Sequence, residues 1–280
     1  MKILHSVAAS IAAILALFAP VTGCSSVRIS PVDTTLARSV PDGDALFSDV
    51  LRAHVNNGLV DYVAIQHDPR FARYISWIGR ARPSRLTNKN ARLAFWINTY
   101  NAWTLKLIAD NYPVHSINDL HSGGRILGHV FHTTVWDRKV VQVGATRYSL
   151  NDIEHRIIRR RFRDPRVHFA LVCAALSCPS LRSEAYTAAR LNAQLDDQAR
   201  LFFAQPAKNH FDVATKTAWL SKILDWYRGD FAGDTAGLLR RIARYLPDPV
   251  RRSIERNADA WHVRHTPYNW ALNEQPGSSH

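Results

Sequence analysis

The sequence has few cysteines, a single methionine and fewer acidic than basic residues. Three cysteines in 280 residues are too few for a disulfide-stabilised scaffold. Internal repeats, low-complexity tracts and internal linkers are also absent from the sequence. Hydrophobic residues make up 46% of the chain, aromatic residues 10% and charged residues 21%, which is the composition of a globular protein. These values exclude a disordered, collagen-like or coiled-coil description of the whole chain.

Positive charge exceeds negative charge, with 36 lysines and arginines against 23 acidic residues and a formal net charge of +13. Arginine supplies 29 of these cations and lysine 7. A basic surface attracts anionic components of a cell envelope, such as lipid head groups, phosphates and carboxylates. Genome base composition explains the arginine excess more simply. Basic residues interleaved with aromatic ones, the pattern of a nucleic-acid surface, are missing, so nucleic acid is not an expected partner.

The N-terminal residues have the pattern of an export signal at 1–23. Lys2 precedes an apolar run at 7–20, which is shorter than the about 20 residues of a membrane-spanning helix. The following Val21-Thr22-Gly23-Cys24 resembles the lipobox of bacterial lipoproteins. This resemblance implies cleavage before Cys24 and acylation of its thiol, which gives a durable membrane anchor. The alternative is an ordinary cleaved signal followed by an unrelated cysteine.

The lipobox resemblance also implies a destination. Ser25 and Ser26 follow it without an aspartate at the second position, so the outer membrane is the default location, with the domain facing the periplasm. Residues 24–41 are predicted to be a lipidated tether. Residues 42–275 are predicted to form one globular domain, followed by a tail at 276–280. The expected partner is therefore a membrane, bound through the lipid anchor.

Hydrophobic periodicity predicts an α+β domain of several helices packed on a small mixed sheet. Helices are expected near residues 44–56, 69–78, 89–110, 150–158, 187–204, 221–228, 235–246 and 249–257. Hairpins are expected at residues 133–143 and 211–220, with a short β-like run at 59–65. Residues 166–173 are apolar on both faces, which predicts a strand buried in a sheet.

The helix expected at 89–110 is apolar almost all round, which is typical of a helix buried in a core. Asn98 and Asn101 lie three residues apart on one face of this helix. A buried amide without a partner costs about 1–3 kcal/mol, so both side chains must form hydrogen bonds. They either fix neighbouring loop backbone, which is the simpler explanation, or orient a substrate or an imidazole.

Ser149 and Asp152 have the spacing of a capping box at the start of the next helix. On that helix Glu154 lies about 40° from Leu150 of the apolar stripe, whereas His155 points away from it. A carboxylate on a core-facing edge is unusual unless it is paired. An arginine such as Arg166 is one expected partner. The alternative is a general acid or base, or a group that orients a histidine.

The densest group of reactive side chains is His168, Cys173 and Cys178. His168 falls inside the predicted strand and Cys178 just beyond its carboxyl end, where active sites gather. A cysteine beside a histidine is the minimum for a thiol nucleophile. In an oxidising envelope, Cys173 and Cys178 would instead form a structural disulfide. A metal site that adds His155 to these residues is disfavoured, because the spacing matches no common zinc pattern.

Several short strings occur in one order along most of residues 45–275. They are Phe95-Trp96-Ile97-Asn98, Tyr100-Asn101-Ala102, Ser149-Leu150, Ile153-Glu154-His155, Asp164-Pro165-Arg166, His168-Phe169-Ala170-Leu171, Ser177-Cys178-Pro179, Asp225-Trp226-Tyr227 and Tyr268-Asn269-Trp270. Together they resemble the family catalogued as domain of unknown function 547. The family has no settled activity, and not every member has both cysteines. The resemblance therefore implies a shared polar site that needs no thiol, at the motif positions Asn98, Asn101, Glu154, His155, Arg166 and His168. Its candidate ligand-binding residues are Asn101, His155 and Arg166.

The leading expectation is a ligand-binding or structural module of the cell envelope that has no catalytic activity. The alternative is a thiol hydrolase or transferase acting on amide bonds. In that scheme Cys178 is the nucleophile, His168 is the base, and Asn98 or Glu154 orients the imidazole. This arrangement is analogous to papain-like and transglutaminase-like sites. No cofactor or metal is expected in either case.

Overall fold

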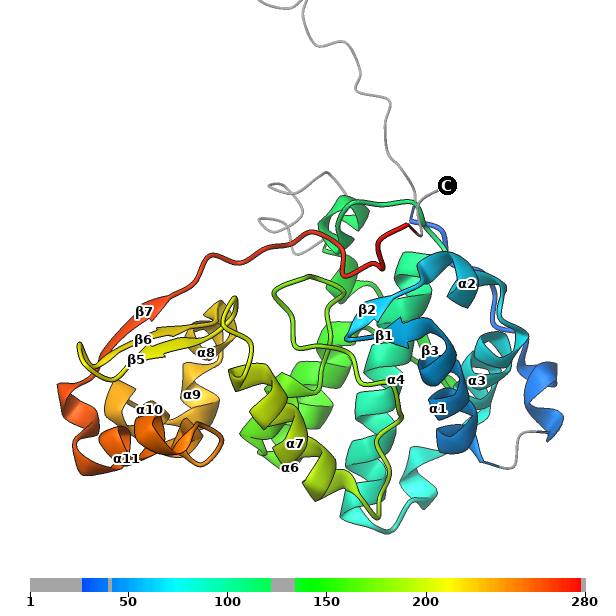
Figure 1. The fold of residues 1–280 in the computed structure, drawn as a ribbon. Helices are drawn as coiled ribbons and strands as arrows, with labels where there is room; N and C mark the ends of the chain where they lie inside the picture. The colour runs from blue at the N-terminus through cyan, green and yellow to red at the C-terminus, as the bar shows by residue number, and fades with distance from the viewer. Residues whose placement is uncertain (1–26, 40–41, 122–133, 278–280) are drawn as a thin grey trace, which may run out of the picture.

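The computed structural model describes residues 27–39, 42–121 and 134–277 as helices and three small sheets (Figure 1). This composition of elements confirms the predicted α+β fold. The predicted signal segment and the predicted lipidation site, Cys24, lie outside the described residues. Within those residues, no helix is both long enough and apolar enough to cross a membrane.

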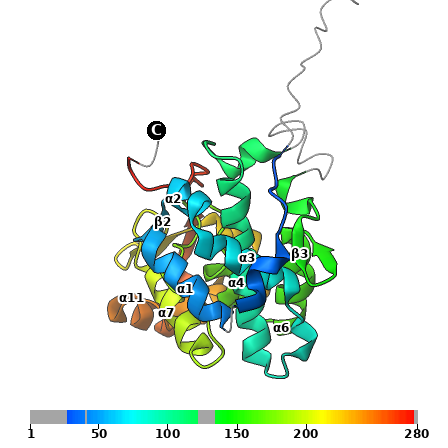
Figure 2. The ribbon, with the colours of Figure 1, turned by 90° about the vertical axis from the view of Figure 1, so that its right-hand side faces the viewer.

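The first half of the fold contains the α-helices α1 (Gly43–His54), α2 (Tyr62–His67), α3 (Pro69–Arg80) and α4 (Lys89–Ala109). α1 packs on α3, and both α2 and α3 contact α4 (Figure 2). α4 is buried at every position from Leu93 to Ala109, as its apolar sequence predicts. The side chains of Asp68 and Asn88 accept backbone hydrogen bonds at the first turns of α3 and α4, which fixes where each helix begins.

The second half contains a mixed sheet and the helices that cover it. Its elements are β5 (His210–Asp212), β6 (Thr217–Leu220), α8 (Lys222–Trp226), α9 (Arg228–Phe231), α10 (Thr235–Ala243), α11 (Asp248–Arg256) and β7 (His262–His265). β6 lies between the other strands, antiparallel to β5 and parallel to β7. The predicted hairpin at 211–220 is confirmed, and each helix predicted after it is present within a few residues.

The remaining elements precede, connect or lie within these two halves. They are η1 (Thr34–Ser39), the hairpin of β1 (Val55–Asn56) and β2 (Leu59–Val60), η2 (Pro83–Arg85), η3 (Ile117–Leu120), η4 (Val135–Asp137), β3 (Val141–Val143), β4 (Thr146–Tyr148), η5 (Asp152–Arg159), α6 (Arg160–Phe162), η6 (Pro165–Phe169), α7 (Leu191–Phe203) and η7 (Ala258–Ala260). η5 is a π-helix, and the other elements labelled η are 3-10 helices.

Residues 166–173 do not form the predicted strand. η6 occupies the first part of this segment, and the chain after it is irregular but buried. Its backbone forms hydrogen bonds with a side chain, where a strand would form them with a neighbouring strand. The amide of Asn101 donates to the carbonyl oxygen of Ala170 (2.9 Å) and accepts from the backbone N–H of Val172 (3.0 Å). An apolar run of this length predicts burial and does not by itself distinguish a strand from another buried segment.

Two shorter strand predictions are also wrong in part. In the run 59–65 only β2 is extended, because Asp61 caps the first turn of α2. In the predicted hairpin at 133–143, residues of η4 form a 3-10 helix, and Thr133 lies outside the described residues. The hairpin occurs one turn later, between β3 and β4, where Gly144 adopts the positive φ of 58° that this tight turn requires.

Buried apolar side chains form two clusters. The first cluster surrounds α4 and the irregular segment after η6, and the second lies between α7, the β5–β7 sheet and α8 to α11. The C-terminal segment at 266–277 runs from β7 back to the first cluster (red in Figure 1). Its backbone accepts hydrogen bonds from Leu176 at Ala271 and from Val60 at Asn273. The chain end therefore ties the two clusters together.

Part of the predicted tether contacts the domain. Val27, Ile29 and Val32 pack against the first cluster. The backbone N–H of Arg28 donates to Asn111 Oδ1 (2.7 Å), just beyond the end of α4. The described part of the tether, from residue 27, is thus attached to the folded body by apolar and polar contacts.

Candidate functional site

A pocket of about 200 Å³ lies where the two clusters of buried side chains meet. Junctions of this kind are common ligand sites. We call it the aromatic pocket. Its lining residues are Tyr100, Trp136, Asn151, Glu154, His168, Leu171, Cys173, Cys178, Ile223, Trp226, Tyr227, Tyr268 and Trp270. Among these described residues Glu154 is the sole carboxylate.

Glu154 is held at the floor of the pocket by the start of η5. The predicted capping box is confirmed, because Ser149 Oγ accepts from the backbone N–H of Asp152 and Asp152 Oδ2 accepts from that of Ser149, both at 3.0 Å. The helix that follows is a π-helix, a rare form that occurs frequently at functional sites. Glu154 is 6% exposed on this helix, as its edge position predicts.

Three tyrosine hydroxyl groups surround the Glu154 carboxylate. Burial, followed by the negative charge of Glu154, raises the pKa of Tyr100, Tyr227 and Tyr268. Tyr100 and Tyr227 also form hydrogen bonds with Glu154, which favour the protonated phenol. At neutral pH these phenols are therefore protonated and neutral.

His168 lines the pocket wall and is oriented by an acidic partner. Its Nε2 lies 2.7 Å from Asp230 Oδ2, on α9, and its ring stacks on Tyr227 with centroids 4.0 Å apart. Asp230 also accepts two hydrogen bonds from Arg159 of η5, at 2.6 and 3.0 Å. The hydrogen bond to His168 and the two to Arg159 hold the pKa of Asp230 far below its ordinary value. Asp230 thus orients the imidazole, a role predicted for Asn98 or Glu154.

Cys173 and Cys178 form a disulfide beside this wall, with their Cα atoms 6.1 Å apart. The hydroxyl of Tyr268 lies 3.2 Å from Cys173 Sγ and 3.4 Å from Cys178 Sγ. Both sulfurs line the pocket, and Cys178 is 3% exposed. In this form Cys178 has no thiol that could act as a nucleophile.

The mouth of the pocket is formed by aromatic rings from segments distant in the sequence. Tyr268 and Trp270 come from the C-terminal segment, and their ring centroids are 4.5 Å apart. Trp226 of α8 lies 4.8 Å from Tyr268, and Trp136 of η4 lies 6.0 Å from Trp270. Trp226 is 49% exposed, so part of its ring is open to solvent at the pocket.

Lys208 supports the backbone behind the disulfide. Its ammonium group donates a hydrogen bond to the carbonyl oxygen of Cys178. Burial lowers the pKa of Lys208 to about 8. This lysine lines a separate hollow, which Cys178 also lines, and does not line the aromatic pocket.

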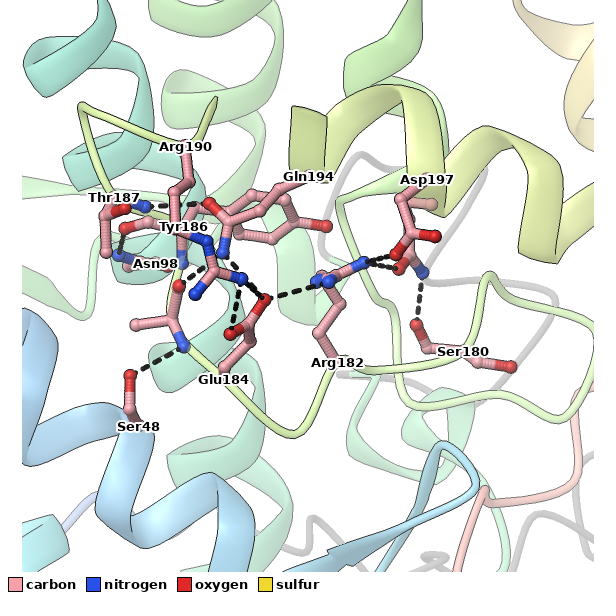
Figure 3. A network of polar contacts seen from close by, with 12 residues as sticks. Ser48, Asn98, Ser180, Arg182, Glu184, Tyr186, Thr187, Arg190, Gln194 and Asp197 are labelled. Carbon is pink, nitrogen blue, oxygen red and sulfur yellow. Dashed lines mark hydrogen bonds and ion pairs between the residues drawn. The ribbon is translucent and has the colours of Figure 1, made fainter. Parts of the chain in front are cut away.

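The two predicted asparagines bond backbone and do not line the aromatic pocket. Asn101 fixes the segment after η6, as described above. Asn98 bonds both backbone groups of Tyr186, donating to its oxygen (2.8 Å) and accepting from its N–H (2.9 Å) (Figure 3). Figure 3 also shows that Arg182 of the same loop pairs with Glu184 (2.8 Å) and with Asp197 of α7 (2.6 Å). Both amides follow the simpler of the two explanations, which is to fix loop backbone.

Arg166 and His155 also do not line the pocket, although the His155 ring lies 6.5 Å from that of the lining residue Tyr227. Arg166 pairs with Asp164 and Asp196, at 2.6 and 3.0 Å, and not with Glu154. Asp164 is two residues away in the sequence, and Asp196 lies on the facing helix α7. Helical periodicity around Glu154 does not predict either pairing. His155 is exposed, with Nδ1 2.7 Å from an Arg159 nitrogen. The described residues hold no cluster of three or more side chains suited to a metal ion.

Sequence reasoning missed Asp230 and the aromatic residues as parts of the site. Trp226, Tyr227, Tyr268 and Trp270 occur in strings that carry the family resemblance, so a signal for them existed. Asp230 follows one of these strings by three residues, and nothing in its local sequence distinguishes it from a surface aspartate.

The pocket draws on a segment that a family model recognises. Residues 83–203 match the model described as protein of unknown function, DUF547. The match supports the family indicated by the motifs. The DUF547 segment supplies the buried floor of the pocket, including Tyr100, Glu154 and His168, whereas Trp226 and Trp270 of the mouth follow it in the sequence. Neither a curated protein nor a solved structure gives a significant match to this chain.

Proposed function

We propose that this chain is an exported, lipid-anchored protein of the outer membrane whose DUF547-containing domain binds a small ligand in the aromatic pocket without catalysing a reaction. The observation that carries the binding role is the pocket itself. It combines a buried carboxylate, fixed phenol donors and a half-exposed tryptophan at the junction of two cores. Pockets with an apolar lining and a few placed polar groups are typical of small-molecule sites.

The export and anchoring part of the proposal rests on the N-terminal sequence. The lipobox-like string ending at Cys24 supports an acyl anchor, and an internal disulfide suits an oxidising compartment. The excess of positive charge favours contact with anionic components of the envelope. A Cys24→Ala variant is expected to lose the acyl mass and to leave the outer-membrane fraction. Retention of both would contradict the anchor.

Native mass spectrometry tests the binding role. The full-length protein, extracted from its membrane in a maltoside detergent, is expected to carry a small molecule that dissociates on activation. Trp226→Ala should reduce this adduct, because it removes a half-exposed ring from the mouth. Leu201→Ala is the matched control, since Leu201 is equally exposed (48%) but does not line the aromatic pocket. An unliganded wild-type protein, or equal loss in both variants, would contradict the proposal.

A thiol hydrolase or transferase acting on amide bonds is the second candidate function. One observation favours it, namely that Cys178 and His168 line the same pocket. The disulfide means that a dithiol would first have to reduce Cys178. Alkylation of protein purified without reductant separates the two functions. Two protected sulfurs support the binding module, whereas one rapidly alkylated thiol that slows in His168→Ala would support the enzyme.

A further inference from the structure

The aromatic pocket places one buried carboxylate below a mouth of tryptophan and tyrosine rings, and from this geometry we propose that its ligand is an organic ammonium cation. A quaternary ammonium group would satisfy the site. This inference rests on the proposed function, because it names the chemistry of the ligand that the pocket binds.

The first argument is the environment of Glu154. Its carboxylate is buried and accepts hydrogen bonds from neutral phenols, including that of Tyr227. Among the described residues, no lysine, arginine or histidine forms an ion pair with it. A buried charge without an opposite charge is unfavourable, because neutral donors replace only part of the lost hydration. A cation entering the pocket would supply the missing partner.

Arg159 is a cation whose charge interacts with that of Glu154, but its guanidinium group already bonds to other residues. Arg159 donates two hydrogen bonds to Asp230 and contacts His155 with its remaining terminal nitrogen. Its guanidinium carbon lies 4.9 Å from the ring centroid of Tyr227. Asp230 thus already pairs with Arg159, and Glu154 is the one carboxylate among the described residues that line the pocket.

The second argument is the aromatic mouth. The face of an aromatic ring attracts a cation, and the indole of tryptophan attracts it most strongly. Trp136, Trp226, Tyr268 and Trp270 form a continuous series of ring contacts around the mouth, with centroid distances of 4.5 to 6.0 Å. An anion would be repelled by both the ring faces and Glu154. A neutral ligand could stack on the rings but would leave the carboxylate without a counter-charge.

Calorimetric titration of the full-length protein in maltoside tests the assignment with choline as the probe. The comparison ligand is the neutral carbon isostere of choline, in which a tert-butyl group replaces the trimethylammonium group. Shape and apolar area are nearly the same, so the difference in affinity reports the charge. We expect choline to bind at least about tenfold more tightly than the isostere. Equal affinities, or no binding of choline at millimolar concentration, would overturn the assignment.

Two variants locate this preference. Glu154→Gln keeps the shape and hydrogen-bonding oxygen of the side chain but removes its charge, and should bring the affinity for choline close to that for the isostere. Trp226→Leu keeps apolar surface at an exposed position and removes a ring, so it should weaken choline binding more than isostere binding. Trp219→Leu is the control, because Trp219 lies on β6 outside the pocket. A full choline preference in both pocket variants would overturn the assignment.

The outcomes separate this inference from the proposed function. Equal binding of choline and its isostere, both lost in Trp226→Leu, would refute the ammonium ligand and leave the aromatic pocket as a binding site. Absence of any adduct in native mass spectrometry, together with no binding of either probe, would refute both.

Discussion

Replacement of Asp230 by asparagine should lower the free energy of unfolding by an amount that depends on pH. Asp230 receives hydrogen bonds from His168 Nε2 and from two nitrogens of Arg159, at 2.6 to 3.0 Å. The asparagine keeps one acceptor oxygen but loses the charge that strengthens these bonds. Since Asp230 is 30% exposed, we expect a loss of about 2 kcal/mol in the free energy of unfolding. For a domain of this size, that loss lowers Tm by about 4–8 °C.

The sign of the pH dependence follows from the direction of the pKa shift. His168 and Arg159 hold the pKa of Asp230 below the value of about 3.9 that an aspartate has in the unfolded chain. The stabilisation is therefore fully present above that value and is lost as the pH falls through it toward the folded-state pKa. Wild type and Asp230→Asn should converge in stability in acid.

Thermal unfolding followed by circular dichroism at several pH values measures this effect. Asp259→Asn is the control, because Asp259 pairs with Arg240 on the surface at a similar distance (2.6 Å) but is 74% exposed. Its Tm should change by about 1 °C or less. A gap between wild type and Asp230→Asn that is no larger than that of the control, or that stays constant down to about pH 3, would refute the reasoning.

Three further predictions concern the support of the pocket. Asn101→Ala removes the amide that forms hydrogen bonds with two buried backbone groups, and should lower the free energy of unfolding in urea by about 2–4 kcal/mol. An unchanged urea midpoint would contradict this role. Replacing both Cys173 and Cys178 by serine opens a loop with a sequence separation of 5 and should lower the free energy of unfolding by about 2 kcal/mol. Equal stability of the wild type with and without reductant would contradict the disulfide. Burial lowers the pKa of Lys208 to about 8, so the charged form is disfavoured in the fold and the unfolded chain binds more protons above that pH. The stability of wild type relative to Lys208→Met should therefore rise between about pH 8 and 10, and a flat or falling difference would contradict this.

The helices were predictable because local chemistry fixes them. Two helix starts are marked by residue type and spacing, at Asp68-Pro69 and at Ser149 and Asp152. The structure shows the corresponding capping hydrogen bonds at both places. The burial of α4 followed from an apolar sequence without a polar face. The placement of Glu154 at a core-facing edge followed from the same periodicity, although its π-helical backbone did not.

The buried segment after η6 could not be assigned correctly from its own residues. Its apolar character requires burial, but the hydrogen bonds that replace a strand ladder come from Asn101, about 70 residues earlier in the chain. The partner of His168 raises the same difficulty, because Asp230 is 62 residues away and reaches it only through the packing of α9. Such pairings depend on tertiary structure, which periodicity and spacing do not encode.

Fluorine NMR of the full-length protein labelled with fluorotryptophan is the most direct test of the central claim, that the aromatic pocket binds an organic ammonium ligand. The chain has 8 tryptophans, of which Trp136, Trp226 and Trp270 line the pocket. Titration with choline should shift these three signals in a saturable way and leave those of buried Trp103 and Trp261 unchanged. No shift, or shifts confined to tryptophans outside the pocket, would contradict the account.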